Sequence, residues 1–336
     1  MKDKMVVNSA VEEAKYSKIL YKELCANEDL IPLFSKDWWL DSVAGVDKWD
    51  VALVLRDGKI IASMPYIIKN KFGLKLCTSP EFTQYLGPWI KPSQAKYAKK
   101  LGQQKDVMID LIEQLPRFDY FSQNWDYKQT NWLPFYWKGF QQTTYYTYVI
   151  DDMSSLDLVW SNLEEKIRTD IRKSTKRYNL ICLDNPSIDY FVQLNRKVYE
   201  RKNIKTPHNE QTFINLDKAC AKNLARKIFI AVDEDGRHHA GVYIVWDKNS
   251  AYYLMSGSDP ELRTSGATSL CLWEAIKFAS TVTKEFNFEG SMMEPVERFV
   301  RGFGGKQRLV FNVSKTPSLL LRLRSSLLSL KGNNTN

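Results

Sequence analysis

The chain has 336 residues, of which 44 % are hydrophobic, and it carries a formal net charge of +9. A chain of this length favours two domains, and its composition can bury a full hydrophobic core, which excludes an intrinsically disordered protein. No apolar run approaches the roughly 20 residues of a membrane-spanning helix, which excludes that class of membrane protein.

The positive charge indicates anionic partners, namely nucleotide phosphates, RNA or an acidic membrane face. A basic surface that only serves solubility is the alternative. The first residues, Met1 to Met5, are not followed by an apolar segment, so we expect no secretory signal. The cysteines are scattered and form no C-x-x-C pair; they are Cys25, Cys77, Cys182, Cys220 and Cys271. This usage is typical of a reducing cytoplasm, so we expect a cytoplasmic protein without disulfides or a zinc site.

The first half contains a predicted β-hairpin over Asp50 to Lys69. Two apolar runs flank Asp57-Gly58, and because glycine reaches positive φ without steric cost, this dipeptide is a strong hairpin signal. A loop with glycine and proline, a helical stretch and a short aromatic strand, Phe118 to Ser122, follow in that order.

The second half repeats this order. Lys227 to Asp247 has the same design around Asp235-Gly236, and its later aromatic strand is Phe286 to Ser291. The repeat predicts two copies of one unit, although the same order also arises by chance in α/β chains. We therefore expect a mixed α/β (α+β) fold with two tandem domains, each a mixed twisted sheet flanked by helices.

The predicted domains are residues 1–150 and 151–316, followed by a basic tail, residues 317–336. The first boundary follows an alternating strand, Thr143 to Ile150. Four helices are expected after it. Ser155 caps a segment whose apolar residues recur at three- and four-residue spacing as far as Ile171. The other three helices are expected at Tyr190 to Arg201, Glu210 to Leu224 and Ala267 to Ala279, the last of them apolar on most sides and hence buried.

The stretch from Tyr252 to Leu272 predicts a phosphate-binding turn, because it leads from a strand to the start of the buried helix. N–H groups at a helix start have no intrahelical partner, and the helix dipole adds partial positive charge there. We therefore expect a diphosphate at this helix start, with a plain turn as the alternative. The residues assigned to the turn are Arg263, Thr264, Ser265, Gly266, Ala267 and Thr268.

The motif Arg263-x-x-Gly266-Ala267, between a strand and a buried helix, resembles the coenzyme A turn of the GNAT acyltransferases. This resemblance implies an acyl-CoA co-substrate, and an acyltransferase activity that needs no metal. The first half has no such motif in its corresponding stretch, Phe72 to Pro88. We therefore expect the domain 1–150 to be a degenerate GNAT-like domain that recognises the acceptor, and the domain 151–316 to bind the donor.

A second resemblance covers the end of the second half. Phe286 to Met292, followed by Glu297 to Gly305, resembles the end of Fem-like acyltransferase domains, where an aromatic-acidic strand leads to a Phe-x-x-x-Phe-Gly-Gly turn. Thr169 to Arg177 is similar to the basic helix that opens their second domain. The resemblance spans about residues 30–315 and implies a tandem pair of GNAT domains.

Two positions depart from these patterns. The GNAT turn usually carries Gly or Ala two residues after its central glycine, where this chain has Thr268, and the peptidoglycan-branching Fem enzymes usually carry lysine where this chain has Val300. We therefore expect an N-acyltransferase that uses acyl-CoA. The alternatives are a Fem-type transferase that uses aminoacyl-tRNA on a peptidoglycan precursor, and an inactive GNAT-like fold that binds RNA or an anionic membrane.

Amide formation needs a neutral amine, so a nearby group must remove a proton. Glu289, at the end of the aromatic strand, is the first candidate for this base, and Glu297 is the second. A strand-end carboxylate bonded to the neighbouring turn is the alternative for Glu289. Backbone N–H groups at Ser256 and Gly257 are expected to stabilise charge on the thioester carbonyl, with the pantetheine arm along the edge of this strand.

Further residues are candidates for binding an amine-bearing, anionic acceptor. Arg168 and Arg172 belong to a basic set on one predicted helix, for which a solvated face is the alternative. Arg298 and Arg301 are similar candidates, and their alternative is ion pairing with neighbouring glutamates. Tyr85 is a candidate for stacking on an acceptor ring.

Histidine chemistry and a bound metal are not expected. The histidines are His208, His238 and His239, and no nucleophile elbow or metal-spaced cluster occurs. His238 and His239 follow the second Asp-Gly turn, so we expect them on an exposed hairpin surface.

The tail from Pro317 to Lys331 combines leucines with Arg322, Arg324 and Lys331 and contains no acidic residue. As an amphipathic helix, residues 317–331 would lie on an anionic membrane, which suits a lipid-linked acceptor and a peripheral place at the inner face of the plasma membrane. Docking on the protein's own core is the alternative. We expect the acceptor to be an amino sugar or amino acid group in envelope polysaccharide or lipid-carrier synthesis.

Overall fold

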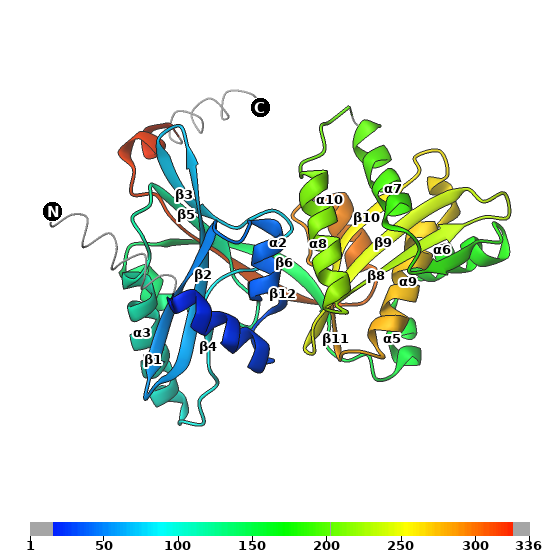
Figure 1. Cartoon of the computed structure of the whole chain (residues 1–336). Helices are drawn as coiled ribbons and strands as arrows, with labels where there is room; N and C mark the ends of the chain where they lie inside the picture. Colours follow the sequence, from blue (N-terminus) through cyan, green and yellow to red (C-terminus); the bar gives the residue numbers. More distant parts are fainter. Residues whose placement is uncertain (1–15, 202, 325–336) are drawn as a thin grey trace. The chain divides into compact units, whose positions relative to one another are not determined.

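The computed structural model describes residues 16–201 and 203–324, which belong to two compact units (Figure 1). Unit 1 contains the residues up to Thr144 and those from Val310 onward, and unit 2 runs from Tyr145 to Leu309. Each unit combines a mixed β-sheet with covering helices, so the predicted mixed α/β class is confirmed. Within the described ranges, no helix is both long and apolar enough to cross a bilayer.

Unit 1 includes helical residues 16–27 near its start and helical residues 319–324 in its C-terminal part. Its other elements are η1 (Leu33–Ser35), α2 (Asp37–Val43), β1 (Trp49–Arg56), β2 (Lys59–Lys71), β3 (Leu74–Thr78), β4 (Trp89–Ile90), α3 (Tyr97–Glu113), β5 (Tyr120–Asn124) and α4 (Leu133–Trp137). Two strands belong to both units in part: β6 (Gln141–Ile150) leaves unit 1, and β12 (Lys306–Lys315) returns to it.

The sheet of unit 1 has the order β1-β2-β3-β5-β12, with β4 beside β2. β1, β2 and β3 form an antiparallel meander, β5 pairs with β3 in parallel, and β12 is antiparallel to β5. The first turn of the meander is the predicted one, with φ values of 51° at Asp57 and 71° at Gly58. The predicted first hairpin is therefore confirmed.

Side chains of unit 1 alternate between two cores, one on each face of the sheet, as the two-residue period of a strand requires. Along β1, Trp49, Val51 and Leu53 face the core that includes helical residues 16–27. Ala52 and Val54 face the opposite core, which α3 covers. Both faces of this sheet are therefore buried.

Unit 2 contains α5 (Leu156–Asn162), α6 (Glu165–Lys176), β7 (Ile181–Asp184), α7 (Ile188–Glu200), α8 (Glu210–Lys222), β8 (Arg226–Val232), β9 (His238–Trp246), β10 (Ser250–Ser258), η2 (Arg263–Ser265), α9 (Ala267–Ala279), β11 (Glu285–Asn287) and α10 (Glu294–Arg301). Its strand order is β7-β8-β9-β10-β11-β6. β8, β9 and β10 form an antiparallel meander, β11 then pairs with β10 in parallel, and β6 is antiparallel to β11. This is the connectivity of unit 1, so the predicted repeat is confirmed.

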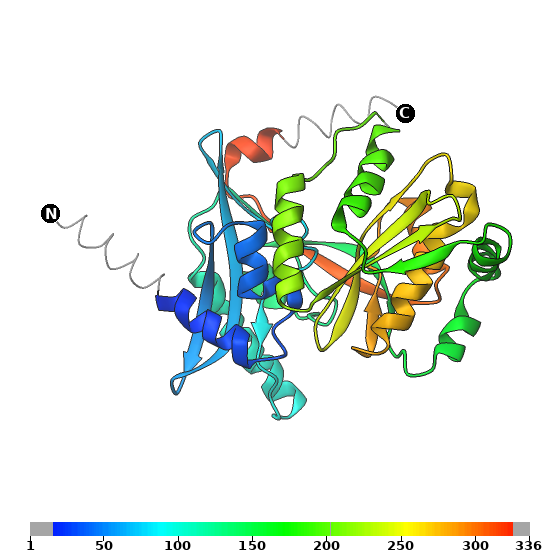
Figure 2. The same ribbon diagram turned by 45° about the vertical axis from the view of Figure 1, so that its right-hand side comes forward.

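Helices cover both faces of the sheet of unit 2, an arrangement that can be followed in Figure 2. Val242 and Ile244 of β9 face the core that α9 and α6 share. Tyr243 points to the opposite face, where its ring lies 5.6 Å from that of Phe191 in α7 and 5.1 Å from that of Phe213 in α8. The predicted buried helix is α9, with the predicted bounds.

The unit boundaries differ from the predicted domains 1–150 and 151–316. Residues 145–150 of β6 complete the sheet of unit 2, and the residues of β12 from Val310 onward complete the sheet of unit 1. Each unit thus takes one strand from across the expected boundary. Of the predicted tail 317–336, residues 325–336 lie outside the described residues.

The helix predicted to run from Ser155 to Ile171 is wrong as a single element. Ser155 caps its start as expected, since its side chain accepts a bond from the N–H of Leu158. The helix breaks at Leu163 and Glu164, which are both extended, and becomes α5 and α6. The break is fixed by burial of Leu163 and by the Glu164 N–H, which donates to the carbonyl of Gly302 over 2.8 Å.

Candidate functional site

The start of α9 offers backbone donors without a capping side chain. The N-cap residue is Gly266, which has no side chain to accept a hydrogen bond, and the first turn of the helix holds no acidic residue. The N–H groups of this first turn have no intrahelical acceptor, so they and the helix dipole favour an anion. Of the residues predicted around the turn, Arg263 and Thr264 are exposed, Thr268 is half-buried and Ala267 is buried.

Gly266 is required by its conformation and by its neighbour α6. Its φ is +78°, and a Cβ added to it would lie 2.5 Å from the carbonyl oxygen of Asp170 and 3.0 Å from Oγ of Ser174. Both of these atoms belong to α6, which therefore leaves no room for a side chain at this position. Glycine here allows α6 to pack directly on the start of α9.

Ser265 faces the interior, although the sequence analysis assigned it to phosphate binding. Its side chain is fully buried, and its hydroxyl donates to the carbonyl of Leu262 over 2.8 Å. Its own carbonyl accepts a 2.8 Å bond from Oγ of Ser174 in α6. Ser265 therefore holds the turn against α6, and its side chain does not face a ligand.

A buried histidine completes this anchor. Nδ1 of His239 lies 3.0 Å from Oγ of Ser265, and Nε2 lies 2.9 Å from Oδ2 of Asp233. The carbonyl of His239 also accepts a 2.9 Å bond from the N–H of Asp259, at the other end of the loop between β10 and α9. One residue of β9 thus holds both ends of the loop that leads to the helix start.

The prediction that His238 and His239 form an exposed hairpin surface is therefore wrong for His239, which is 3 % exposed. His238 is half-buried, with its ring 4.4 Å from that of Tyr190. The two side chains separate because adjacent residues of a strand face opposite sides of the sheet.

Asp233 is expected to make the protein acid-sensitive. Burial alone raises the pKa of its carboxyl, but hydrogen bonds from His239 and Arg237 outweigh burial and hold this pKa well below its usual range. A lowered pKa in the folded state stabilises the protein above pH of about 4, the pKa of an unfolded aspartate, and this stability is lost as pH falls further. Urea unfolding of unit 2 should therefore show a free energy of unfolding that falls below pH 4.

Asp233→Asn should be less stable than the wild type at pH 7 and should show a shallower fall in stability below pH 4. Asp235→Asn is the matched control, because Asp235 is exposed on the same hairpin and pairs with the same arginine, Arg237. Parallel pH curves for the wild type and Asp233→Asn would show that the carboxylate does not stabilise the fold in this way.

The parallel strands β10 and β11 separate part-way along β10, the strand that leads to this helix start. Their pairing ends at Tyr252 and Asn287, whereas β10 continues to Ser258. Beyond Tyr252, no strand of the described chain pairs with that edge of β10. Because parallel strands end at the same edge of a sheet, the free edge of β10 leads towards the loop that enters α9.

Ser256 and Gly257, the predicted donors to a thioester carbonyl, lie on this part of β10. The carbonyl of Ser256 accepts a 2.9 Å bond from Nδ2 of Asn195 in α7. A Cβ on Gly257 would lie 2.4 Å from the backbone nitrogen of Asn195, so this glycine allows α7 to contact the strand. The helix α7 therefore fixes the strand at the point where the edge is open.

Glu289 follows the last paired residue of β11, in a tight turn where the two strands part. Its φ is +57° and that of Gly290 is +60°. The side chain of Asn287 holds the turn, because its Oδ1 accepts bonds from the N–H of Glu289 over 2.8 Å and from Oγ1 of Thr147 over 2.7 Å. Glu289 thus lies in the turn that leads β11 away from β10; the residue is half-buried, and both of its carboxylate oxygens are buried.

Glu297, the second predicted base, is engaged within unit 2. Its carboxylate accepts hydrogen bonds from the hydroxyl of Tyr148 and from Nε of Arg301. Arg301 also pairs with Glu164, at 3.0 Å. These bonds tie α10 to α6 and β6, which agrees with the ion-pairing alternative for Arg301; Arg298 is exposed.

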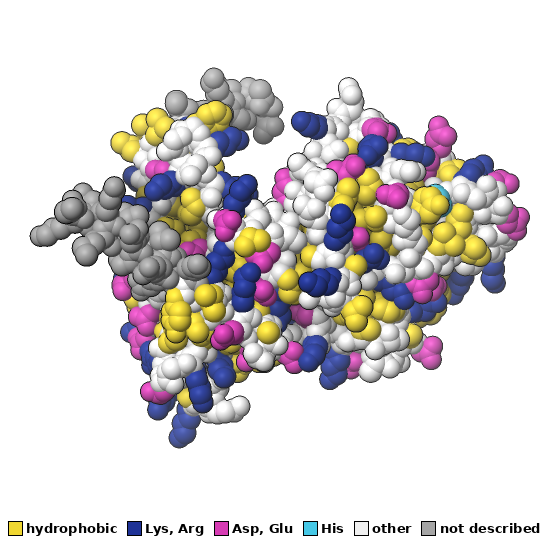
Figure 3. Space-filling model, in the orientation of Figure 1, with side chains coloured by type: hydrophobic (Ala, Val, Ile, Leu, Met, Phe, Trp, Pro, Cys, Tyr) yellow, Lys and Arg dark blue, Asp and Glu magenta, His cyan; other side chains and the backbone are white. Residues whose placement is uncertain are grey.

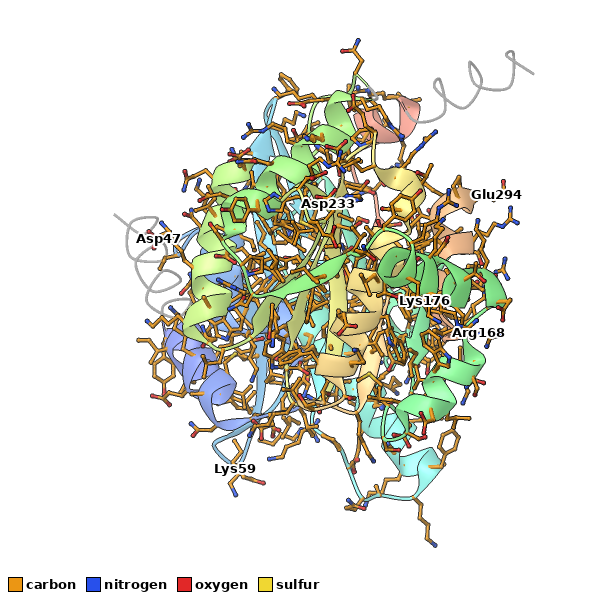
Figure 4. The ribbon with its side chains drawn as sticks, turned by 90° about the vertical axis from the view of Figure 1, so that its right-hand side faces the viewer. Asp47, Lys59, Arg168, Lys176, Asp233 and Glu294 are labelled. Atoms are coloured by element: carbon orange, nitrogen blue, oxygen red, sulfur yellow. The ribbon has the colours of Figure 1, made fainter. Side chains whose placement is uncertain are left out.

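The side chains of the other predicted acceptor-binding residues make their contacts away from the start of α9. Arg168 and Arg172 lie on α6, where Nη2 of Arg168 and Nη1 of Arg172 lie 2.7 and 3.4 Å from the carboxylate of Glu165; Figure 4 labels Arg168 and Lys176 on this helix. Tyr85 is 4 % exposed in unit 1, with its ring 5.9 Å from that of Phe34, so it is a core residue. Its predicted role in stacking on a ligand is therefore wrong.

Sequence reasoning missed a small, open pocket in unit 2, between α7, α8 and β10. Its lining residues are Val192, Asn195, Arg196, Thr206, His208, Glu210, Phe213 and Met255. Apolar side chains line part of it, and an ion pair of Arg196 with Glu210, at 2.8 Å, adds both signs of charge. Met255 precedes Ser256 on β10, so the pocket adjoins the strand with the open edge.

Comparison with known families agrees with this geometry. Residues 161–288 match the sequence model of the family described as "Acetyltransferase (GNAT) domain". This range begins in α5 and ends directly after β11, so it includes the uncapped helix start and both separating strands. Most of unit 2 therefore matches a GNAT domain. No curated protein matches the chain.

The tandem GNAT fold of the whole chain also occurs in solved structures. The chain is similar to FemX, with a TM-score of 0.60 and 12 % identity over 89 % of this chain and 95 % of that one. The C-terminal domain of a putative lysylphosphatidylglycerol synthetase from Agrobacterium fabrum has a TM-score of 0.56 and 12 % identity, over 94 % of this chain and 97 % of that one. L-PGS from Bacillus licheniformis has a TM-score of 0.51 and 10 % identity, over 84 % of this chain and 89 % of that one. At these identities the likeness shows the fold, which is the Fem-like tandem of GNAT domains.

Proposed function

We propose that the protein is an acyltransferase whose GNAT domain binds acyl-CoA. The observation that supports this best is one combination: the uncapped start of α9 follows, after the loop 259–266, a strand, β10, that β11 leaves open beyond Tyr252. Backbone N–H groups of the first turn of α9 would bind the diphosphate. Arg263 and Thr264, exposed before the helix, and Thr268 within its first turn would add side-chain donors.

The extended pantetheine arm would pair with the open edge of β10, as a peptide strand adds to a sheet. Its thioester would then lie near Ser256 and Gly257, where a backbone N–H can stabilise the oxyanion. Glu289, placed where β11 departs, would accept the proton of the attacking amine, directly or through a water. Attack of the amine on the carbonyl carbon then breaks the C–S bond and gives an amide and the thiolate of coenzyme A, which takes up a proton from solvent.

The acceptor would lie against the small pocket lined by α7, α8 and Met255. It would be the amine of an amino sugar or amino acid group in envelope polysaccharide or lipid-carrier synthesis. Glu210 would hold a cationic part of such a molecule, and Arg196 would hold an anionic part. Since the pocket adjoins β10, an amine bound there would approach the thioester from the α7 side.

An aminoacyl-tRNA donor is the second candidate, because the whole chain shares the tandem fold of FemX. The two donors are distinguished by titrating the full-length protein with acetyl-CoA and longer acyl-CoAs in a calorimeter, and with tRNA in gel-shift experiments. We expect saturable acyl-CoA binding without a tRNA shift. A tRNA complex in the absence of acyl-CoA binding would instead support the Fem-type transferase.

Thr268→Glu tests the diphosphate site without disturbing the fold. A carboxylate in the first turn of a helix stabilises it, so the melting temperature should stay the same or rise. The same charge would repel the diphosphate, so the dissociation constant of coenzyme A should increase at least tenfold. Thr268→Gln is the matched neutral control and should bind almost as the wild type does. Equal affinities of the Glu and Gln variants would place the diphosphate elsewhere.

A further inference from the structure

The hairpin between β2 and β3 in unit 1 ends in an exposed aromatic residue. Its two-residue turn consists of Phe72 and Gly73, with φ values of 52° and 75°. The side chain of Phe72 is 90 % exposed. A bulky residue in the left-handed region is an outlier, because its Cβ crowds the backbone there.

The same chain shows how such a turn is made without this strain. The β1–β2 turn has the same pair of left-handed residues, but its first position holds Asp57, of a residue type that tolerates this region. The fold therefore does not require phenylalanine at position 72. Since backbone strain combined with an exposed apolar ring stabilises nothing in the folded chain, Phe72 points to contact with a partner.

A second apolar surface lies at the same end of unit 1. The N–H of Ser318, directly before helical residues 319–324, donates a 3.4 Å bond to the carbonyl of Asp119. The Asp119 N–H in turn donates to the carbonyl of Lys75, which lies close to the turn of the hairpin and pairs with Asn70. Both ribbon views show the short helix beside the β2–β3 hairpin (Figures 1 and 2). Leu319, Leu320 and Leu323 of this helix are 64 %, 67 % and 57 % exposed.

Basic residues accompany both apolar groups, and neither segment contains an acid: residues 69–75 read KNKFGLK, and residues 317–324 read PSLLLRLR. Exposed cations are Lys69, Lys71, Lys75, Arg322 and Arg324. Nζ of Lys71 lies 5.7 Å from the ring of Phe72. Figure 3 shows hydrophobic side chains gathered at this end of unit 1 with Lys and Arg side chains beside them.

We propose that this surface, formed by Phe72, the three exposed leucines and the surrounding cations, docks on an anionic lipid bilayer. The aromatic ring and the leucines would enter the region between headgroups and acyl chains, and the lysines and arginines would contact lipid phosphates. A membrane fits better than a nucleic acid, because bases stack on aromatic rings but not on leucine side chains. The proposal concerns unit 1 and does not depend on which acyl donor unit 2 uses.

The test compares two asparagine variants of the full-length protein by co-sedimentation with vesicles. Phe72→Asn removes the ring and relieves the strain, since asparagine tolerates the left-handed region. Leu224→Asn is the matched control, because Leu224 is also left-handed at φ 51° and 81 % exposed, but belongs to unit 2. The vesicles are equimolar phosphatidylglycerol and phosphatidylcholine, with pure phosphatidylcholine as the uncharged comparison.

Phe72→Asn should lower the partition coefficient on the anionic vesicles at least fivefold, with an unchanged or higher melting temperature, whereas Leu224→Asn should bind as the wild type does. Lys71→Gln should weaken binding by about fivefold, the effect of one cation near an anionic membrane. Equal partition coefficients for Phe72→Asn and the wild type would overturn the proposal. So would a wild type that does not bind the anionic vesicles. If the wild type forms a complex with tRNA, and Phe72→Asn loses this complex but still binds the vesicles, the surface binds nucleic acid instead. Acyl-CoA titrations of the same variants test the proposed function separately.

Discussion

Glu289→Gln is expected to lower kcat by about 10²–10⁴-fold, the range that a general base contributes. The change keeps the size of the side chain and leaves the turn intact, because the turn is held by the bond between the Glu289 N–H and Oδ1 of Asn287. Coenzyme A affinity should stay within a few-fold, since the donor contacts lie at α9 and along β10. Steady-state kinetics with a small amine and acetyl-CoA, together with calorimetry, separate these effects.

Glu297→Gln is the matched control for this prediction. Glu297 accepts hydrogen bonds from Tyr148 and Arg301, so its substitution should lower stability and leave kcat within about tenfold. The pH dependence adds a second readout, because only loss of the base should flatten the acidic limb of the kcat profile. A near-normal rate for Glu289→Gln, or a larger loss for Glu297→Gln, would reverse the two assignments.

The parts of the fold that follow from short stretches of sequence were predictable. Asp57-Gly58 and the turn at Gly236 gave both hairpins, because these residues adopt left-handed conformations that few others tolerate. The bounds of α9 followed from an apolar run that begins after Gly266. Ser155 was identified as a cap from its place before an apolar period. Each of these signals is local, so one sequence is enough to see it.

The parts that depend on distant contacts were not predictable in this way. β6 and β12 each complete a sheet on the other side of the expected boundary, and nothing within either strand states its partner. The break between α5 and α6 depends on a bond from Glu164 to Gly302, far along the chain. Tyr85 was expected to stack on a ligand, and His239 was expected on an exposed hairpin surface because it follows the Asp-Gly turn, but tertiary packing buries both.

The sequence motif predicted a candidate site at Gly266, but it did not predict the packing around this residue. The helix start at Gly266 was found from its motif, and the match of residues 161–288 to a GNAT domain agrees with it. The glycine was explained by access for a phosphate, whereas in the structure it is α6 that contacts it. The pocket between α7 and α8 was not seen at all, because its residues come together only when β10 packs against α7.

Gly266→Ala is expected to lower the free energy of unfolding of unit 2 by about 2–5 kcal/mol. A left-handed φ costs an alanine about 1–2 kcal/mol, and forcing a methyl group into packed surroundings adds about 1–3 kcal/mol. The second cost arises because the new Cβ would lie 2.5 Å from the carbonyl oxygen of Asp170, which is backbone and cannot rotate away. Hydrogen exchange of the amides of α6 and α9 reports this loss within unit 2.

Gly236→Ala isolates the backbone cost, because Gly236 has a similar φ of +76°, lies in the same unit and has no atom within 4 Å of an added Cβ. It should lower the free energy of unfolding by only about 1–2 kcal/mol. Equal losses for the two alanine variants would show that α6 yields to the methyl group and does not constrain the turn. If the loss at Gly266 is the larger, weaker coenzyme A binding by that variant follows from displacement of α6 and the helix start. Contact with the diphosphate itself is then read from Thr268→Glu, whose side chain changes the charge of the site without this clash.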